Sequence, residues 1–110
     1  MSNPTDPVHR LVIYKPKQGH YDQLKAILLS HGPALAKSGL LREGHSVQLW
    51  SASDLRRHGH PPDPYFVESF YWRDEKAANV AHELPEIMSV WETMGPHLET
   101  LTLTTLEPLV

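Results

Sequence analysis

The segment that most constrains the fold is residues 65–72, with the sequence YFVESFYW. Aromatic and β-branched residues dominate it, and such residues favour a pleated, packed strand. Because successive side chains of a strand point to opposite faces, aromatic side chains are expected on both faces of this one. The segment therefore predicts a strand that needs cover on two sides, which a lone exposed hairpin cannot give.

The rest of the chain divides into elements of alternating type. Residues 8–15 alternate as a strand, with Leu11 and Ile13 on one face, and residues 45–51 predict a second strand. Residues 18–38 carry apolar side chains at helical spacing, and Gly32-Pro33 predicts a kink or break within them because proline removes a backbone donor. Beyond the aromatic strand, the elements expected are a short helix that Asp74 caps, a helix from Pro85 to Met94, and a last strand over 98–109.

This order, strand–helix–strand–strand–helix–strand, is that of a ferredoxin-like α+β fold with an antiparallel four-stranded sheet. We expect one domain over residues 8–110, preceded by a flexible lead-in over 1–7 that contains two prolines. Both helices are expected on one sheet face. The other face would then expose apolar side chains, so we expect it to stack against a second copy in a homodimer. The connection over 52–64 is long for a hairpin, and long loops are often functional or part of an interface.

Composition excludes several classes of function. The 110 residues have a formal net charge of −3 and no basic cluster, which argues against nucleic-acid binding. There is no cysteine, so thiol chemistry and disulfides are excluded. The lack of a long apolar run or a signal-peptide core predicts no membrane association and a cytoplasmic location.

Recurrent chemical motifs are missing as well. His58 and His60 could share a metal ion in the long loop, but zinc sites use three or four ligands, so we expect no built metal site. The glycine patterns of a nucleophile elbow or a phosphate-binding loop do not occur.

The run from Tyr65 to Pro96 resembles a known family. An aromatic strand ending Tyr71-Trp72-Arg73-Asp74 enters an Ala-rich helix with His82, and a helix over 85–91 follows. In this the chain resembles the dimeric α/β-barrel superfamily, and within it the antibiotic-biosynthesis-monooxygenase-like domains. The resemblance implies a pocket between sheet and helices. Some relatives oxygenate aromatic polyketides or quinols there without metal or flavin, others degrade haem, and others are isomerases or have no known activity.

The haem branch fits this sequence poorly. The resemblance places Trp91 where the axial histidine would stand, and the first strand has no asparagine. We therefore expect no cofactor.

Five residues are candidates for the site. His31 and His82 are candidate catalytic bases, because histidine titrates near neutral pH. Trp72, Asn79 and Trp91 are candidate substrate-binding residues, the tryptophans as flat walls with an indole donor. Each has a structural alternative: His31 as a hydrogen-bonded core residue, His82 as a half-exposed helix residue, the tryptophans as core, and Asn79 as a solvent-facing side chain.

Three hypotheses of function remain open at this level. The first is a cofactor-independent monooxygenase acting on an aromatic or quinol-like small molecule. The second is a non-catalytic dimeric module that binds a ligand or a protein. The third is an isomerase or decarboxylase on the same scaffold, with a histidine base.

Overall fold

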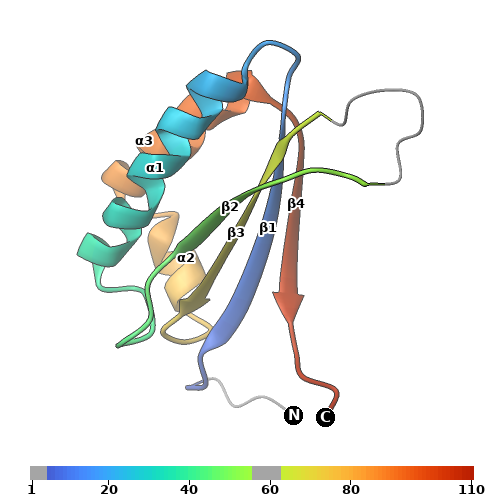
Figure 1. The fold of residues 1–110 in the computed structure, drawn as a ribbon. Coiled ribbons are helices and arrows are strands. Elements are labelled where there is room, and N and C mark those ends of the chain that lie inside the picture. The colour runs from blue at the N-terminus through green and yellow to red at the C-terminus, as the bar shows by residue number, and fades with distance from the viewer. Residues whose placement is uncertain (1–4, 56–62) are drawn as a thin grey trace.

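A computed structural model describes residues 5–55 and 63–110, and in them one antiparallel sheet carries helices on one face (Figure 1). The strand order is β2-β3-β1-β4, so the first and third strands lie in the middle. This is the α+β ferredoxin-like fold that the sequence predicts. The elements of the described chain are β1 (Val8–Pro16), α1 (Tyr21–Ser38), β2 (Gln48–Ala52), β3 (Tyr65–Trp72), α2 (Ala77–Ala81), α3 (Pro85–Met94), the 3₁₀ turn η1 (Gly95–His97) and β4 (Leu98–Leu106).

The register of the two central strands gives the sheet two unlike faces. Val12 of β1 lies opposite Glu68 of β3, and Tyr14 lies opposite Phe66. These residues are all buried, on the face that the helices cover. The alternate residues of the same strands, such as Ile13 and its partner Val67, lie on the open face and are only half-buried. The two-sided apolar character predicted for β3 is thus present.

Helix α1 runs from Tyr21 to Ser38 without interruption, so the break predicted at Gly32-Pro33 is wrong. Proline removes one backbone donor, and the carbonyl left without a partner is that of Leu29, four residues earlier. The Leu29 side chain is 60% exposed, so this side of the helix faces solvent, where water can satisfy the free carbonyl. The helix ends at Gly39, whose φ of 75° is the left-handed cap conformation that the sequence predicts.

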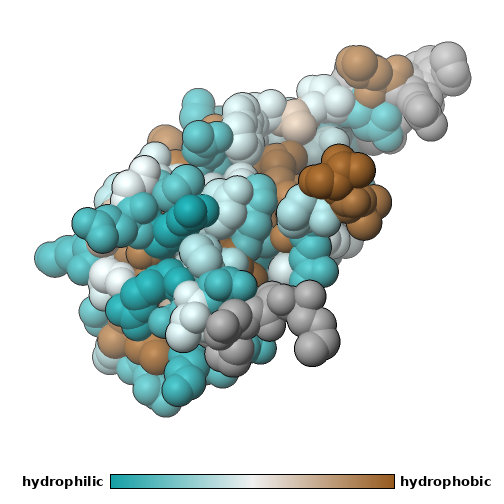
Figure 2. All heavy atoms as spheres, turned by 90° about the horizontal axis from the view of Figure 1, so that it is seen from below, coloured by the Kyte–Doolittle hydropathy of each residue, from teal (hydrophilic) through white to brown (hydrophobic). Residues whose placement is uncertain are grey.

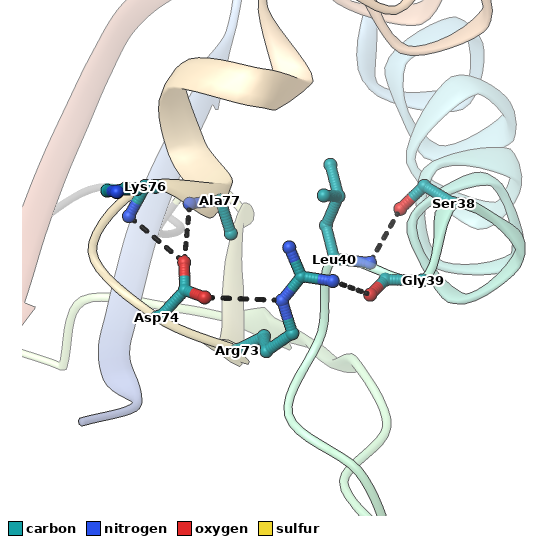
Figure 3. A network of polar contacts seen from close by, with 7 residues as sticks. All are labelled: Ser38, Gly39, Leu40, Arg73, Asp74, Lys76 and Ala77. Carbon is teal, nitrogen blue, oxygen red and sulfur yellow. Dashed lines mark hydrogen bonds and ion pairs between the residues drawn. The ribbon is translucent and has the colours of Figure 1, made fainter. Parts of the chain in front are cut away.

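A polar network ties the end of α1 to the start of α2 (Figure 3). One carboxylate oxygen of Asp74 accepts hydrogen bonds from the backbone amides of Lys76 and Ala77, each at 3.0 Å. The side chain thus satisfies amides at the start of α2 as expected, but the N-cap position itself is Lys76, two residues later. Arg73 donates to the Gly39 carbonyl at 3.3 Å and pairs with Asp74 at 3.3 Å. The network fixes the position of α2, which borders the site described below.

Other element boundaries shift by a few residues. Strand β2 begins at Gln48 and not at His45, and β4 ends at Leu106 and not at Leu109. Helix α3 begins with Pro85 in its first turn and ends at Met94, as predicted. Most of the long loop predicted over 52–64, including both of its histidines, lies outside the described residues, as do residues 1–4 of the expected lead-in.

The end of the molecule seen from below is largely hydrophilic, with hydrophobic side chains in separate groups (Figure 2). None of the helices in the described ranges combines the length and the apolar character of a membrane span.

Candidate functional site

The centre of the candidate site is a carboxylate without solvent contact. Glu68 stands on β3 between Phe66 and Phe70 on the helix-covered face, and its side chain is 0% exposed. The Tyr14 hydroxyl donates to its Oε1 at 2.7 Å, and Nδ1 of His31 lies 2.8 Å from its Oε2. A buried carboxylate is tolerated only when such donors satisfy it, so the two partners are part of the reason it can be there.

His31 links this carboxylate to helix α3. It lies on the inner side of α1, 2% exposed, and its Nε2 receives a hydrogen bond from the indole of Trp91 at 2.9 Å. An indole N–H can only donate, so Nε2 must be the acceptor nitrogen. The proton of the neutral imidazole is therefore on Nδ1, which donates it to Glu68. In this arrangement the Glu68 carboxylate orients the imidazole of His31 and would stabilise the protonated form of that imidazole.

Tyr14 stays a proton donor in this arrangement. Burial raises the pKa of its hydroxyl far above the ordinary value, and the charge of Glu68 and the hydrogen bond to it raise the pKa further. The phenol is thus held in its neutral form, donating to the carboxylate.

The histidine borders a pocket of about 350 Å³ between the sheet and the helices. His31, Tyr14 and Trp91 line it together with Arg10. Most of its remaining wall is apolar: Val12, Phe70, Trp72, Ala78, Met94, Leu98, Leu101 and Leu103. A largely apolar hollow with a few convergent polar groups is the usual form of a small-molecule site.

Trp72, which lines the pocket, carries an unsatisfied donor. Its side chain is 3% exposed, and its indole nitrogen is buried with no hydrogen-bond partner among the described residues. A buried donor without a partner is costly, so this position is one where the structure stores unfavourable free energy.

The structure brings four of the five sequence-predicted site residues to this pocket. His31, Trp72 and Trp91 line it as described. His82, which directly follows α2 as its C-terminal cap, lines it as an exposed residue whose ring meets Trp91 edge-on at 4.9 Å between centroids. Asn79 is exposed on the same helix and is not among the lining residues. Their roles remain predictions.

Sequence reasoning did not single out Tyr14 and Glu68. A signal for Glu68 existed: it alternates in phase with Phe66 and Phe70, so a carboxylate had to share a buried face with aromatic rings. A buried carboxylate needs partners, but the sequence does not say which elements provide them.

Metal ligation finds no support in the part of the chain that the structure describes. No group of three or more His, Cys, Asp or Glu side chains there is placed to hold an ion. His58 and His60, at which the sequence predicts no built metal site, lie outside the described residues.

The fold and the site together define a class: a ferredoxin-like domain with an apolar pocket and a buried histidine–carboxylate pair. No model of a known protein family matches the chain, and no curated protein matches it. Solved structures do match the chain in fold. Rv0793 from Mycobacterium tuberculosis is 19% identical, with a TM-score of 0.75 over 96% of this chain and 97% of that chain.

Two further structures are named for an activity. A variant of SnoaB, a cofactor-independent oxygenase from Streptomyces nogalater, is 13% identical with a TM-score of 0.68, covering 96% of this chain and 95% of that one. A structure named antibiotic biosynthesis monooxygenase is 12% identical with a TM-score of 0.70, covering 94% of this chain and 99% of that one. The chain therefore shares the ferredoxin-like fold of these structures, and at these identities the likeness establishes the fold alone.

Proposed function

We propose that this protein is a cofactor-independent monooxygenase that acts on an aromatic or quinol-like small molecule, with His31 as its general base. The observation that carries the proposal is the buried pair of His31 and Glu68, 2.8 Å apart, at the wall of an apolar pocket. The fold shared with SnoaB, whose name records cofactor-independent oxygenase activity, supports the choice of reaction.

The chemistry follows from the polarity of the pair. Nε2 of His31 takes a proton from an acidic O–H or C–H group of the substrate, and Glu68 stabilises the imidazolium that forms. The substrate anion is electron-rich and can pass one electron to O₂. Recombination of the two radicals gives a peroxide, which takes up a proton and loses water to leave a carbonyl. For an activated methylene the balance is R₂CH₂ + O₂ → R₂C=O + H₂O.

The pocket favours a planar apolar substrate with oxygen substituents. Its volume of about 350 Å³ accepts two or three fused rings, and its wall is mostly hydrophobic. The unpartnered indole nitrogen of Trp72 would bind a substrate carbonyl or phenolate oxygen, which is the role the sequence predicts for this residue.

Oxygen uptake tests the proposal. With dithranol or 1,4-naphthohydroquinone as substrate, we expect consumption above the spontaneous rate, and His31→Asn should lower kcat by at least about 100-fold because a general base is lost. The control is His45→Asn, an exposed histidine that lies outside the pocket. Equal rates in the wild type and His31→Asn would overturn the assignment of the base.

A second candidate is favoured by the same pair. A histidine held by a carboxylate in an apolar pocket also suits proton transfer without oxygen, as in an isomerase or decarboxylase. Deuterium exchange from solvent into the substrate under anaerobic conditions, with no oxygen uptake in air, would support this candidate over the first.

We propose further that the open sheet face pairs with a second copy of the chain. That face carries Leu11, Ile13 and Val67 in the middle of the sheet, all half-buried, with Trp50 48% exposed on the adjoining edge strand. An apolar patch of this kind normally marks an interface, and a two-fold axis would bring the same patch of each copy together.

Ile13→Lys tests the pairing. It places a charge at the centre of the patch, and we expect it to shift the mass in sedimentation equilibrium from twice that of one chain to that of one chain. Leu29→Lys is the matched control, because Leu29 is 60% exposed on α1 and away from the sheet. A wild type that sediments as a single chain at micromolar concentration would contradict the pairing.

A further inference from the structure

In the resting protein, the acceptor nitrogen of the proposed base is already occupied. Trp91 donates its indole N–H to Nε2 of His31 at 2.9 Å, while Nδ1 is engaged by Glu68 at 2.8 Å. Both nitrogens of the imidazole are therefore satisfied, and no lone pair is free to take a proton from a substrate. Any ligand that uses His31 has to replace the indole.

The direction of the hydrogen bonds restricts what can replace it. Trp91 donates to His31, His31 donates to Glu68, and Tyr14 donates to Glu68 from the other side. In this series of hydrogen bonds, every donated proton thus points toward the Glu68 carboxylate. A ligand in the position of the indole must itself offer an O–H or N–H proton, because an acceptor atom would leave the buried Nε2 unsatisfied.

Of the four residues in this series of hydrogen bonds, Trp91 is best placed to move. His31 and Glu68 are 2% and 0% exposed, whereas Trp91 is half-buried and borders the pocket. Its ring leans edge-on against His82, which is exposed at the rim. An indole displaced from His31 can reach solvent with its N–H, so its own donor is not left without a partner.

We propose that Trp91 is the specificity-determining residue of the pocket, because its indole N–H holds the place that the hydroxyl of a ligand takes on His31. This deepens the proposed function by stating which apolar molecules the site accepts: those with a donor group. A hydroxyl exchanges one hydrogen bond for another, whereas an ether of the same shape has no proton for Nε2, so it leaves the bond between Trp91 and His31 in place and binds through the apolar wall alone.

Binding of a matched pair of probes tests the inference. The probes are 2-naphthol, which carries a hydroxyl, and 2-methoxynaphthalene, in which a methyl group replaces its proton. In Trp91→Phe an aromatic ring remains and the competing N–H is gone, so we expect the affinity for 2-naphthol to rise by about 10-fold, the equivalent of one hydrogen bond, and that for 2-methoxynaphthalene to change little.

Nuclear magnetic resonance of ¹⁵N-labelled protein supplies a second measurement, whose signal would not change on ligand binding if Trp91 had a purely structural role. Adding 2-naphthol to the wild type should shift the indole resonance of Trp91 and the Nε2 resonance of His31 together, while the indole resonance of Trp50, on the open face, stays in place. The inference is overturned if Trp91→Phe changes the affinity for both probes equally, or if naphthol binds without moving the Trp91 indole resonance.

The outcome is separable from that of the oxygenase proposal. Hydroxyl-selective tightening in Trp91→Phe without oxygen uptake in any variant would retain Trp91 as the specificity residue and remove the monooxygenase. Oxygen uptake that depends on His31, with no hydroxyl selectivity in Trp91→Phe, would do the reverse.

Discussion

The eight residues of strand β3 alternate between two faces, and the two faces differ in their chemistry. Toward the helices, Phe66, Phe70 and Trp72 are 2–4% exposed, and Glu68 among them is 0% exposed. On the other face, the alternate residues are all half-buried. The difference shows that helices remove one face from water and so strengthen each polar contact there, while the open face keeps polar contacts that water can replace.

The polar contacts on the two faces differ accordingly. On the covered face, Glu68 is bonded to Tyr14 and His31, and the loss of a partner would leave a buried group unsatisfied. On the open face, Nε2 of His9 lies 2.7 Å from the Ser69 hydroxyl, with solvent nearby. The covered face can thus hold an oriented base, and the open face is suited to assembly.

The largest effect is expected at the buried carboxylate. Glu68→Ala leaves the Tyr14 hydroxyl and Nδ1 of His31 without a partner, and we expect the free energy of unfolding to fall by about 3 kcal/mol. Glu68→Gln is the matched control, because its amide can accept from His31 and donate to the Tyr14 oxygen. Guanidinium unfolding measures both. A loss under about 1 kcal/mol in Glu68→Ala would contradict the view that the covered face makes its polar contacts costly to break.

A smaller effect, with a pH signature, is expected at Tyr14. Tyr14→Phe removes one hydrogen bond to a charged group, so at pH 8 we expect a loss of about 1.5 kcal/mol. Because folding raises the pKa of Tyr14, its contribution is complete below the unfolded value of about 10 and is lost as pH rises above it.

Above pH 10 the wild type should therefore lose stability faster than Tyr14→Phe, by up to about 1.4 kcal/mol per pH unit. The two unfolding free energies, measured at pH 8 and pH 11, should converge. A difference that stays constant between these values would show that the phenol titrates alike in the folded and unfolded chain.

The smallest effect is expected on the open face. Ser69→Ala removes the hydroxyl that meets His9. Made together with Ile13→Lys, which keeps the open face in solvent, it is expected to cost only about 0.5 kcal/mol relative to Ile13→Lys alone, because water can replace the hydroxyl. Thermal unfolding monitored by circular dichroism measures it. A loss as large as that of Glu68→Ala would erase the distinction between the faces.

Much of the fold could be predicted from the sequence. The alternation in 65–72 located β3 to the residue, and Pro85 marked the start of α3. These signals are local, because strand alternation and helix capping are decided by neighbouring residues. The predicted break at Gly32-Pro33 failed because the cost of an inserted proline depends on what surrounds the helix, and α1 keeps its exposed side toward solvent at that point.

The site was predicted only in part. His31 was recognisable as a polar residue on an apolar helical stripe, and Trp72, Trp91 and His82 followed from the resemblance. Glu68, to which His31 donates, lies 37 residues further along the chain, and Trp91 lies 60 residues away from His31. No local pattern connects residues so far apart.

The sequence by itself determined which face of each element is apolar, and with it the order and packing side of the strands and helices. The tertiary structure alone decided that Tyr14, Glu68, His31 and Trp91 form one hydrogen-bonded chain beside an apolar pocket. Periodicity is encoded in the spacing of neighbouring residues, whereas hydrogen bonding between four separate elements depends on the register of β1 with β3 and on the position of α1 and α3 above them.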